Sequence, residues 1–209
     1  MAGEADDAAL LVRWREGDTA AADQLVQRHF AAIYRFFAAK VGDAADELTQ
    51  RVFLSCIEAR DRIDPSRPLR PYLFGIARNT LLKHLRQHYT DRGRFAPDQT
   101  SIHDAGLRAG PGVVTVREEQ RALHMGLARL PVDLQFTLEM YYWWGLSIGE
   151  IAQATEVPIG TVKSRLSRGR TALREQLEQL EIDPAKRERL MLAADEFTAV
   201  QRDVGPPAQ

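Results

Sequence analysis

The stretch that decides the fold is Leu146-Ser147-Ile148-Gly149-Glu150-Ile151-Ala152-Gln153-Ala154-Thr155-Glu156-Val157-Pro158-Ile159-Gly160-Thr161-Val162-Lys163-Ser164-Arg165-Leu166. Residues 146–154 predict a short helix, residues 155–158 a tight turn, and the residues from 159 onward a second helix. Apolar side chains recur at the spacing that packs two short helices across a turn, and Ala152 is small where those helices would approach each other. This pattern predicts a helix-turn-helix.

The second helix of this motif predicts contacts with DNA, because in a helix-turn-helix it enters the major groove with its N-terminal end first. Five residues would then reach base edges or phosphates: Thr161, Lys163, Ser164, Arg165 and Arg168. Arginine suits guanine edges and phosphates because its planar fork donates two hydrogen bonds at once. The alternative is an ordinary helical hairpin with a basic surface, which the combination of turn, spacing and charge disfavours.

Charge is distributed unevenly along a chain whose 209 residues carry a formal net charge of −1. Residues 1–59 hold ten acidic and six basic side chains, whereas residues 60–94 hold three acidic and nine basic ones. Residues 157–174 hold five basic side chains and no acidic one, and residues 177–209 are acidic again. Two basic blocks in a nearly neutral protein are typical of two polyanion-binding surfaces, although either block alone would also fit a solvated helix face.

The first half of the chain predicts helices as well. Apolar residues recur at helical spacing, with breaks at Gly17 and Gly42. Asp18 or Thr19 is expected to cap the helix that follows Gly17, because a short oxygen side chain accepts hydrogen bonds from its free N–H groups. Three prolines in residues 61–71 predict a loop before a further helix.

Glycine and proline interrupt every pattern from about residue 89 to residue 116, which predicts a flexible linker. We therefore expect an all-α fold of two small helical domains. The expected boundaries are a first domain at residues 1–90, a linker at 91–116, a helix-turn-helix domain at 117–180 and a partly helical or disordered extension at 181–209.

Composition argues against several classes of protein. No apolar run approaches the roughly 18 residues of a membrane helix, and the N-terminus lacks the basic-then-apolar pattern of a signal peptide. Cys56 is the only cysteine, which excludes an internal disulfide framework and favours a cytoplasmic protein. The sequence has no phosphate-binding glycine loop, metalloprotease motif or nucleophile elbow, so we expect no enzyme activity, no cofactor and no metal.

Together these features resemble the extracytoplasmic-function (ECF) sigma factors of bacterial RNA polymerase. The motifs that carry the resemblance are Asp46-Glu47-Leu48-Thr49-Gln50-Arg51-Val52-Phe53 (region 2.2), Tyr72-Leu73-Phe74-Gly75-Ile76-Ala77-Arg78-Asn79 (regions 2.3 and 2.4), and Leu130-Pro131, Met140-Tyr141-Tyr142 and residues 145–166 (region 4). The resemblance covers about residues 8–90 and 117–177. It implies a subunit that directs core RNA polymerase to promoters by recognising their −10 and −35 elements, with the helix-turn-helix on the −35 element.

The resemblance also implies that region 2.2 docks on a coiled coil of the polymerase's largest subunit, and that the polymerase flap is a second contact. The residues on the docking positions are Asp46, Glu47, Gln50 and Phe53. Carboxylates there would pair with basic residues of the coiled coil, whereas Arg51 stands where an acidic residue is common and would weaken docking. The alternative for Asp46 and Glu47 is simple solvation at a helix start, which the helix dipole favours.

The loop from Asp64 to Pro71 and the helix after it are implied to meet the −10 element, where a base is flipped out of the duplex into a pocket. The residues expected there are Arg67, Arg70, Tyr72, Arg78, Asn79, Lys83 and Arg86. Asn79, Lys83 and Arg86 share one helix face and can follow a phosphate backbone. Tyr72 stands where a tryptophan is frequent and still offers a ring for stacking, while Leu69 and Phe74 are expected in the core.

Other conspicuous residues favour structural roles. The aromatic run 141–144 precedes the helix-turn-helix and is expected to be core with a partly exposed tryptophan, rather than a base-stacking surface. His84 and His88 lie one turn apart but have no third metal ligand nearby in sequence. Cys56 is expected to be a small core residue rather than a redox sensor.

Three classes of function remain open from the sequence. The first is a sigma factor, whose partners are core RNA polymerase and promoter DNA, with an anti-sigma factor or a Ser/Thr kinase as regulator and no membrane insertion. The second is a stand-alone helix-turn-helix regulator, which would dimerise on a palindrome. The third is a module whose basic faces bind acidic proteins. Thr49 in region 2.2 is the candidate for phosphorylation, since a phosphate there would offset Arg51.

Overall fold

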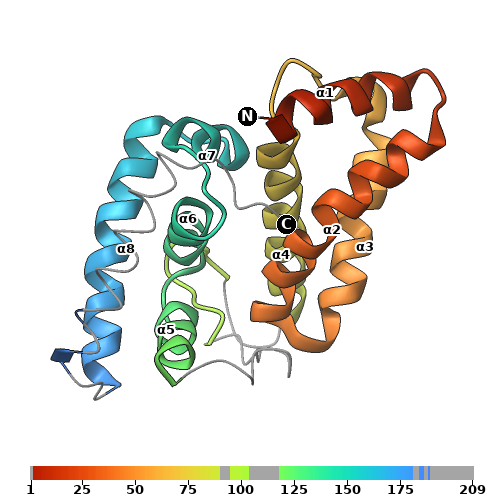
Figure 1. Cartoon of the computed structure of the whole chain (residues 1–209). Coiled ribbons are helices and arrows are strands. Elements are labelled where there is room, and N and C mark those ends of the chain that lie inside the picture. Colours follow the sequence, from red (N-terminus) through yellow and green to blue (C-terminus); the bar gives the residue numbers. More distant parts are fainter. Residues whose placement is uncertain (1, 90–94, 104–117, 181–183, 186–187, 189–209) are drawn as a thin grey trace.

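The computed structural model describes residues 2–89, 95–103, 118–180, 184–185 and 188, and its helices form two groups that lie side by side (Figure 1). The first group contains α1 (Ala2–Arg15), α2 (Thr19–Val41), α3 (Ala45–Glu58) and α4 (Leu69–Tyr89), with short 3-10 turns η1 (Gly42–Ala44) and η2 (Arg60–Arg62). The second contains α5 (Glu118–Ala128), α6 (Val132–Tyr142), α7 (Ile148–Thr155) and α8 (Ile159–Gln179). The expected all-α fold is confirmed: the part of the chain that the structure describes has one isolated bridge, Ser101 to Pro131, and no named strand.

The helix boundaries of the first group follow the predicted breaks. Gly17 adopts a φ of 100° between α1 and α2, a conformation that favours glycine. The carboxylate of Asp18 accepts hydrogen bonds from the backbone N–H groups of Ala20 and Ala21 at 3.0 and 3.2 Å, so it is the N-cap of α2. Gly42, with a φ of 50°, ends that helix.

The helix-turn-helix forms where the sequence predicts it. Ser147 and Glu150 form a capping box at the start of α7: the Ser147 hydroxyl accepts from the Glu150 N–H at 3.2 Å, and the Ser147 N–H donates to the Glu150 carboxylate at 2.7 Å. Glu156 ends α7 in the left-handed region with a φ of 56°. The second helix of the motif, α8, then packs on α6, and a Cβ at Gly169 would lie 3.1 Å from the Leu138 side chain. A larger residue at this position would therefore require the Leu138 side chain to shift by a few tenths of an ångström.

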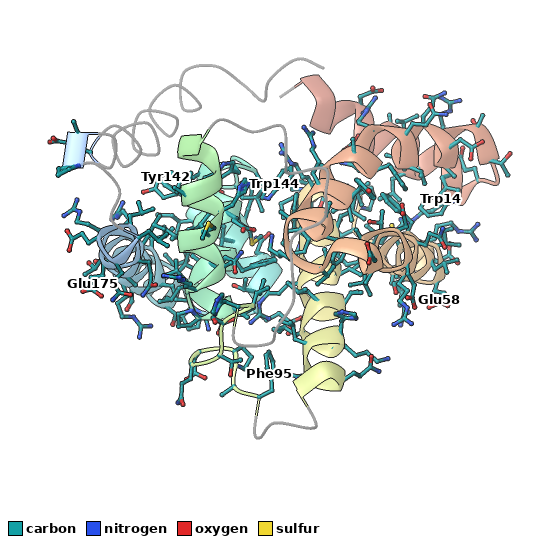
Figure 2. The ribbon with its side chains drawn as sticks, turned by 90° about the horizontal axis from the view of Figure 1, so that it is seen from below. Trp14, Glu58, Phe95, Tyr142, Trp144 and Glu175 are labelled. Carbon is teal, nitrogen blue, oxygen red and sulfur yellow. The ribbon has the colours of Figure 1, made fainter. Side chains whose placement is uncertain are left out.

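The two groups share one hydrophobic core, which the prediction of a flexible linker did not anticipate. The Phe36 ring of α2 meets the Phe136 ring of α6 edge-on, with centroids 5.3 Å apart. The Phe74 ring of α4 lies 5.0 Å from the Trp144 ring, and Figure 2 shows Trp144 between the two groups. Leu69 and Phe74 are buried as expected.

Candidate nucleic-acid interface

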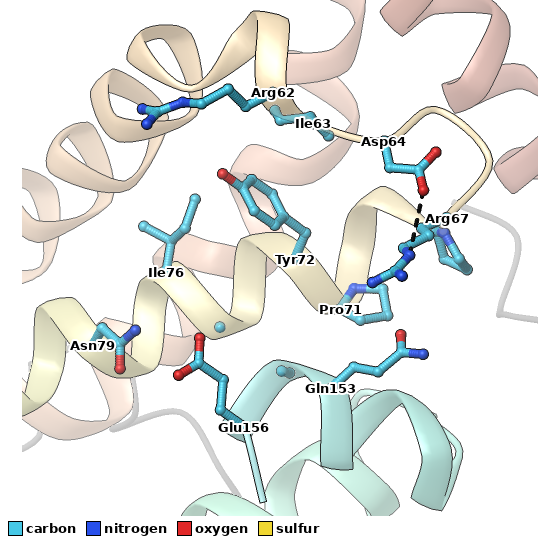
Figure 3. Close-up of a pocket in the computed structure, with 13 residues that line it drawn as sticks. Arg62, Ile63, Asp64, Arg67, Pro71, Tyr72, Ile76, Asn79, Gln153 and Glu156 are labelled. Carbon is cyan, nitrogen blue, oxygen red and sulfur yellow. Dashed lines mark ion pairs between the residues drawn. The ribbon is translucent and has the colours of Figure 1, made fainter.

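A cavity of about 290 Å³ opens on α4 near its start (Figure 3). Three of the residues expected at the −10 element line it: Arg67, Tyr72 and Asn79. The loop before α4 is shaped by Asp64, whose carboxylate accepts from the Ser66 hydroxyl at 2.7 Å and lies 3.4 Å from the Arg67 guanidinium. The structure thus brings a cation, an aromatic ring and an amide together around one hollow.

Tyr72 is the aromatic member of this cavity, and 37% of its surface is exposed. Partial burial raises the pKa of Tyr72 above its ordinary value, so its hydroxyl stays protonated and can donate a hydrogen bond. The ring offers a face for stacking, and the amide of Asn79 on the same helix can both donate and accept. This arrangement is chemically suited to a nucleobase.

Three further polar side chains line the cavity that the sequence did not assign to a site: Arg62, Gln153 and Glu156. Arg62 belongs to the first basic block, so charge alone was a signal for it. Gln153 and Glu156 come from the end of α7, and in Figure 3 they project toward α4 from the opposite side of the cavity. No local pattern could have predicted them, because their position depends on how the two groups of helices pack.

The other residues that were expected at the −10 element lie on two different faces of α4. Lys83 and Arg86 are exposed further along the helix, as Asn79 is, whereas Arg70 is half-buried. Arg78 turns to the other side, where its Nη2 lies 2.6 Å from Oδ1 of Asp133 on α6 and its guanidinium lies over the Phe136 ring. The sequence placed Arg78 on a DNA-facing surface, and the structure places it against a buried carboxylate instead.

The residues of α8 that were expected to contact DNA also divide between an exposed and a buried face. Lys163, Ser164 and Arg168 are exposed and Thr161 is partly exposed, which suits contacts with DNA. Arg165 departs from the expectation: its Nη2 lies 2.5 Å from Oδ2 of Asp133, and only 14% of its side-chain surface is exposed. Asp133 therefore holds two arginines, each on one carboxylate oxygen, and only 8% of the Asp133 side chain is exposed.

The surface of α3 carries the residues expected to dock on polymerase. Asp46, Glu47 and Gln50 are exposed, while Phe53 is mostly buried and stacks on Phe30 of α2 with centroids 6.1 Å apart. Arg51 forms an ion pair with Glu47 at 2.5 Å. One of the two carboxylates that were expected to meet the polymerase is therefore already paired within the chain.

The same surface contains apolar side chains that the sequence analysis missed. Phe30, Leu54 and Ile57 on α2 and α3 are 40%, 57% and 52% exposed. These large apolar side chains lie on two neighbouring helices, so they make this face a candidate interaction surface. Their signal in the sequence was weak, because an apolar residue on an amphipathic helix is normally assigned to the buried stripe.

Thr49 does not fit the phosphorylation expected for it. It is fully buried in α3, and its hydroxyl donates a 2.7 Å hydrogen bond to the carbonyl of Ala45. A kinase would reach this oxygen only if α3 opened. A lone threonine in a sequence gives no indication of which helix face it will occupy.

The aromatic run and Cys56 lie where the sequence predicts them. Tyr142 is buried, and Trp143 and Trp144 are half-buried against the core. Cys56 is buried, and burial raises its pKa to about 11. The side chain of His88 lies outside the described residues. Within the described part of the chain, no group of three metal-binding side chains occurs, and no helix is long and apolar enough to cross a membrane.

Comparisons with known proteins match both groups of helices. The family model of Sigma-70 region 2 matches residues 25–90, and that of Sigma-70 region 4 matches residues 120–173. The RNA polymerase sigma-H factor of Pseudomonas aeruginosa is 31% identical over 193 residues, which cover 86% of this chain and 98% of that protein. The ECF RNA polymerase sigma factor SigC of Mycobacterium tuberculosis is 30% identical over 171 residues, covering 79% of this chain and 88% of that protein. The chain belongs to the ECF sigma factors.

In this ECF sigma factor, the region 2 match covers most of α2 and all of α3 and α4, and the region 4 match covers most of α5 through to α8. A solved structure agrees with the fold: the sigma factor RpoE in complex with the anti-sigma factor NepR from Bartonella quintana has a TM-score of 0.55 and 25% sequence identity, and covers 75% of this chain and 96% of that chain. The family resemblance stated from the sequence motifs is therefore confirmed.

Proposed function

We propose that this ECF sigma factor binds core RNA polymerase and directs transcription initiation at promoters through their −10 and −35 elements. The observation that carries the proposal is the cavity on α4, where Arg67, Tyr72 and Asn79 meet next to the exposed Lys83 and Arg86. A base extruded from the −10 element would stack on the Tyr72 ring and bond to the Asn79 amide. Stacking of a base on an aromatic side chain is worth about 1–3 kcal/mol, enough to offset most of the extrusion cost.

The −35 element is proposed to bind α8. Lys163, Ser164 and Arg168 are exposed on a helix that follows a capped, tight turn, an arrangement that suits entry into a major groove. Arg165 has a different proposed role. Because its guanidinium is held by Asp133 of α6, it orients the recognition helix on the body of region 4.

Docking on polymerase is proposed to use α3 and the adjacent part of α2. The exposed acids Asp46 and Glu47 border the apolar side chains of Phe30, Leu54 and Ile57. Protein interfaces combine an apolar centre with a polar rim, and this surface has both components. The acidic rim would select a basic partner, such as the coiled coil of the largest polymerase subunit.

An anti-sigma protein is the proposed regulator. The related RpoE structure contains the anti-sigma factor NepR, which supports this class of partner. The buried hydroxyl of Thr49 is inaccessible to a kinase in the folded protein, so Thr49 is not a regulatory phosphorylation site in this proposal.

The test begins with a pull-down of the purified full-length protein on bacterial core RNA polymerase, followed by transcription from a library of genomic fragments. We expect stable association and new start sites, which together define the promoter. On that promoter, Tyr72→Ala should lose permanganate-reactive bases at the −10 element but keep the −35 footprint. Lys163→Ala should weaken the −35 footprint. DNA binding as a dimer without polymerase association would overturn the proposal and favour a stand-alone regulator.

A further inference from the structure

The cavity on α4 has walls from both groups of helices, and the wall that faces α4 comes from α7 (Figure 3). Gln153 and Glu156 project from this wall, while Tyr72 and Asn79 belong to the wall that α4 forms. The walls are close together, since a Cβ added to Gly75 would lie 3.0 Å from a backbone oxygen of α7. A volume of about 290 Å³ lies near the lower end of the range for ligand sites, which suits one small molecule.

Several polar groups around the cavity are available to such a molecule. Four side chains that line it form no hydrogen bond or ion pair with another residue that the structure describes: Arg62, Asn79, Gln153 and Glu156. They comprise a cation, two amides that both donate and accept, and an anion. This set is complementary to a flat polar ligand that carries a negative group at one end and hydrogen-bond donors at another.

The carboxylate of Glu156 is held at the cavity by an unusual backbone conformation. Glu156 ends α7 with a φ of 56°, where glycine would be less strained. Strained residues of this kind cluster at ligand sites. Because a carboxylate accepts two hydrogen bonds and donates none, it selects a ligand edge with two adjacent N–H donors. Guanine has such an edge in its N1–H and exocyclic amino groups, whereas adenine presents an acceptor at N1.

The α4 side of the cavity suits the ring of a base. Tyr72 offers a partly exposed aromatic face, and stacking on such a face tolerates any base. The amides of Asn79 on this wall and of Gln153 on the other can donate to the acceptors that a base keeps on its remaining edges. The specificity for guanine would therefore come from α7 and the stacking from α4.

Two guanidiniums at the cavity suit a phosphate. Burial raises the pKa of Tyr72 and the positive charge of Arg62 opposes that rise, so Arg62 acts within electrostatic reach of the tyrosine hydroxyl. Arg67 lies 3.4 Å from the carboxylate of Asp64, which offsets part of its charge. Arg62 is thus the cation of the cavity that keeps its charge for a ligand, and a guanidinium fork matches phosphate oxygens.

We propose that this cavity binds a free guanine nucleotide, in which Tyr72 stacks on the base, Glu156 accepts from its Watson–Crick edge and Arg62 binds the phosphate. The site goes beyond the −10 recognition proposed above, because α7 supplies the group that selects the base. The two functions share Tyr72, so a bound nucleotide would compete with a promoter strand for that ring. A guanine within a single strand has the same chemistry, and the test must separate these two sources.

Isothermal titration calorimetry of the purified full-length protein, without polymerase, compares three probes: GMP, AMP and a 12-nucleotide oligothymidylate with one central guanine. We expect saturable binding of one GMP per chain, and about tenfold weaker binding of AMP, which lacks the pair of donors for Glu156. Absence of saturable binding up to about 1 mM GMP, or equal affinity for GMP and AMP, would overturn the proposal. Binding of the oligonucleotide without binding of GMP would also overturn it, because the cavity would then serve a strand alone.

Variants on the two walls test the assigned roles. Glu156→Gln keeps the length of an exposed side chain, so it is expected to fold. It should lower the affinity for GMP about tenfold without lowering that for AMP. Arg62→Gln should weaken GMP but not guanosine, which has no phosphate. The matched control is Glu175→Gln, which removes a carboxylate from an exposed position of α8 outside the cavity and should change neither affinity. Unchanged GMP binding by Glu156→Gln would contradict the proposed site.

The failure of this proposal is distinguishable from that of the proposed function, because the titration uses neither polymerase nor a promoter. If only the function fails, GMP still binds the free protein and Glu156→Gln still weakens it. If only the nucleotide site fails, Tyr72→Ala still abolishes melting of the −10 element by the holoenzyme, while no variant responds to GMP.

Discussion

At the residue scale, Arg51 changes the charge of the surface on which it lies. Its guanidinium is 2.5 Å from the Glu47 carboxylate, and both side chains are largely exposed on α3. Such an exposed pair contributes little to folding, because water screens it. On the surface proposed to dock on polymerase, Arg51 therefore engages Glu47 and adds a positive charge.

Arg51→Gln is therefore expected to tighten binding to core polymerase by roughly two- to fivefold, because it releases Glu47 and removes a repelling charge. Affinity measured at low and at physiological salt checks this, and the gain should shrink as salt rises. Arg13→Gln on α1 is the matched control: it breaks an exposed ion pair with Asp18, the N-cap of α2, and should leave affinity unchanged. Equal or weaker binding by Arg51→Gln would show that Glu47 does not meet the polymerase.

Cys56 makes a second residue-scale prediction, based on its pKa. Burial raises that pKa to about 11, so at pH 8 about one thiol in a thousand is ionised, compared with about a quarter at the ordinary value of about 8.5. Iodoacetamide should therefore alkylate the native protein at least about a hundred times more slowly than the urea-unfolded chain. The native rate should rise about tenfold per pH unit from pH 8 to pH 10. A native rate close to the unfolded one would mean that the first group of helices opens readily.

At the element scale, α7 is only eight residues long and depends on its ends. A helix of this length is unstable alone, because few hydrogen bonds offset the cost of nucleation. The capping box of Ser147 and Glu150 satisfies N–H groups at its start, and the left-handed Glu156 ends it. The direction in which α8 leaves the turn thus depends on the capping box and on the backbone conformation of Glu156.

Ser147→Ala is expected to lower the free energy of unfolding by about 1 kcal/mol, because it removes one half of the capping box. Urea denaturation of the full chain, followed by circular dichroism, measures this loss. Ser167→Ala is the control, since Ser167 lies exposed in the interior of α8, where alanine is the better helix former. If both variants lose equal stability, the cap contributes nothing.

The elements were predictable because their signals are local. Asp18, Ser147 and Gly42 begin or end helices through bonds and dihedral angles within a few residues, and the sequence shows such residues directly. The directions of Arg78 and Arg165 were not predictable, since both depend on Asp133, which is distant in sequence. Helical periodicity assigns a residue to a face but does not say which other helix will cover that face.

At the scale of the whole molecule, a buried ion pair lies between the two groups of helices. Burial lowers the pKa of Lys40 below its ordinary value, although the nearby Glu139 carboxylate opposes this. The ammonium also lies 3.9 Å from the centroid of the Phe36 ring. No sequence pattern marked Lys40, because a lysine near the end of a helix is normally solvated.

The shared core predicts that the unaltered protein unfolds in a single calorimetric transition. Lys40→Met should weaken the coupling between the groups by about 3–5 kcal/mol, because it leaves Glu139 buried without its cation, and should split the transition into two. The double variant Lys40→Met with Glu139→Leu should restore a single transition, since neither charge then remains. Two transitions in the unaltered protein, or no change in Lys40→Met, would contradict a shared core.

Glu156 has a consequence for how this chain can evolve. A non-glycine residue at a φ of 56° costs about 1 kcal/mol, and glycine at that position would carry no such strain. Selection for stability alone would therefore favour glycine or asparagine there. Some descendants of this chain could keep a carboxylate at the strained position. Its retention would indicate selection for the negative charge that lines the cavity. Lineages that lose it would show that the turn alone was under constraint.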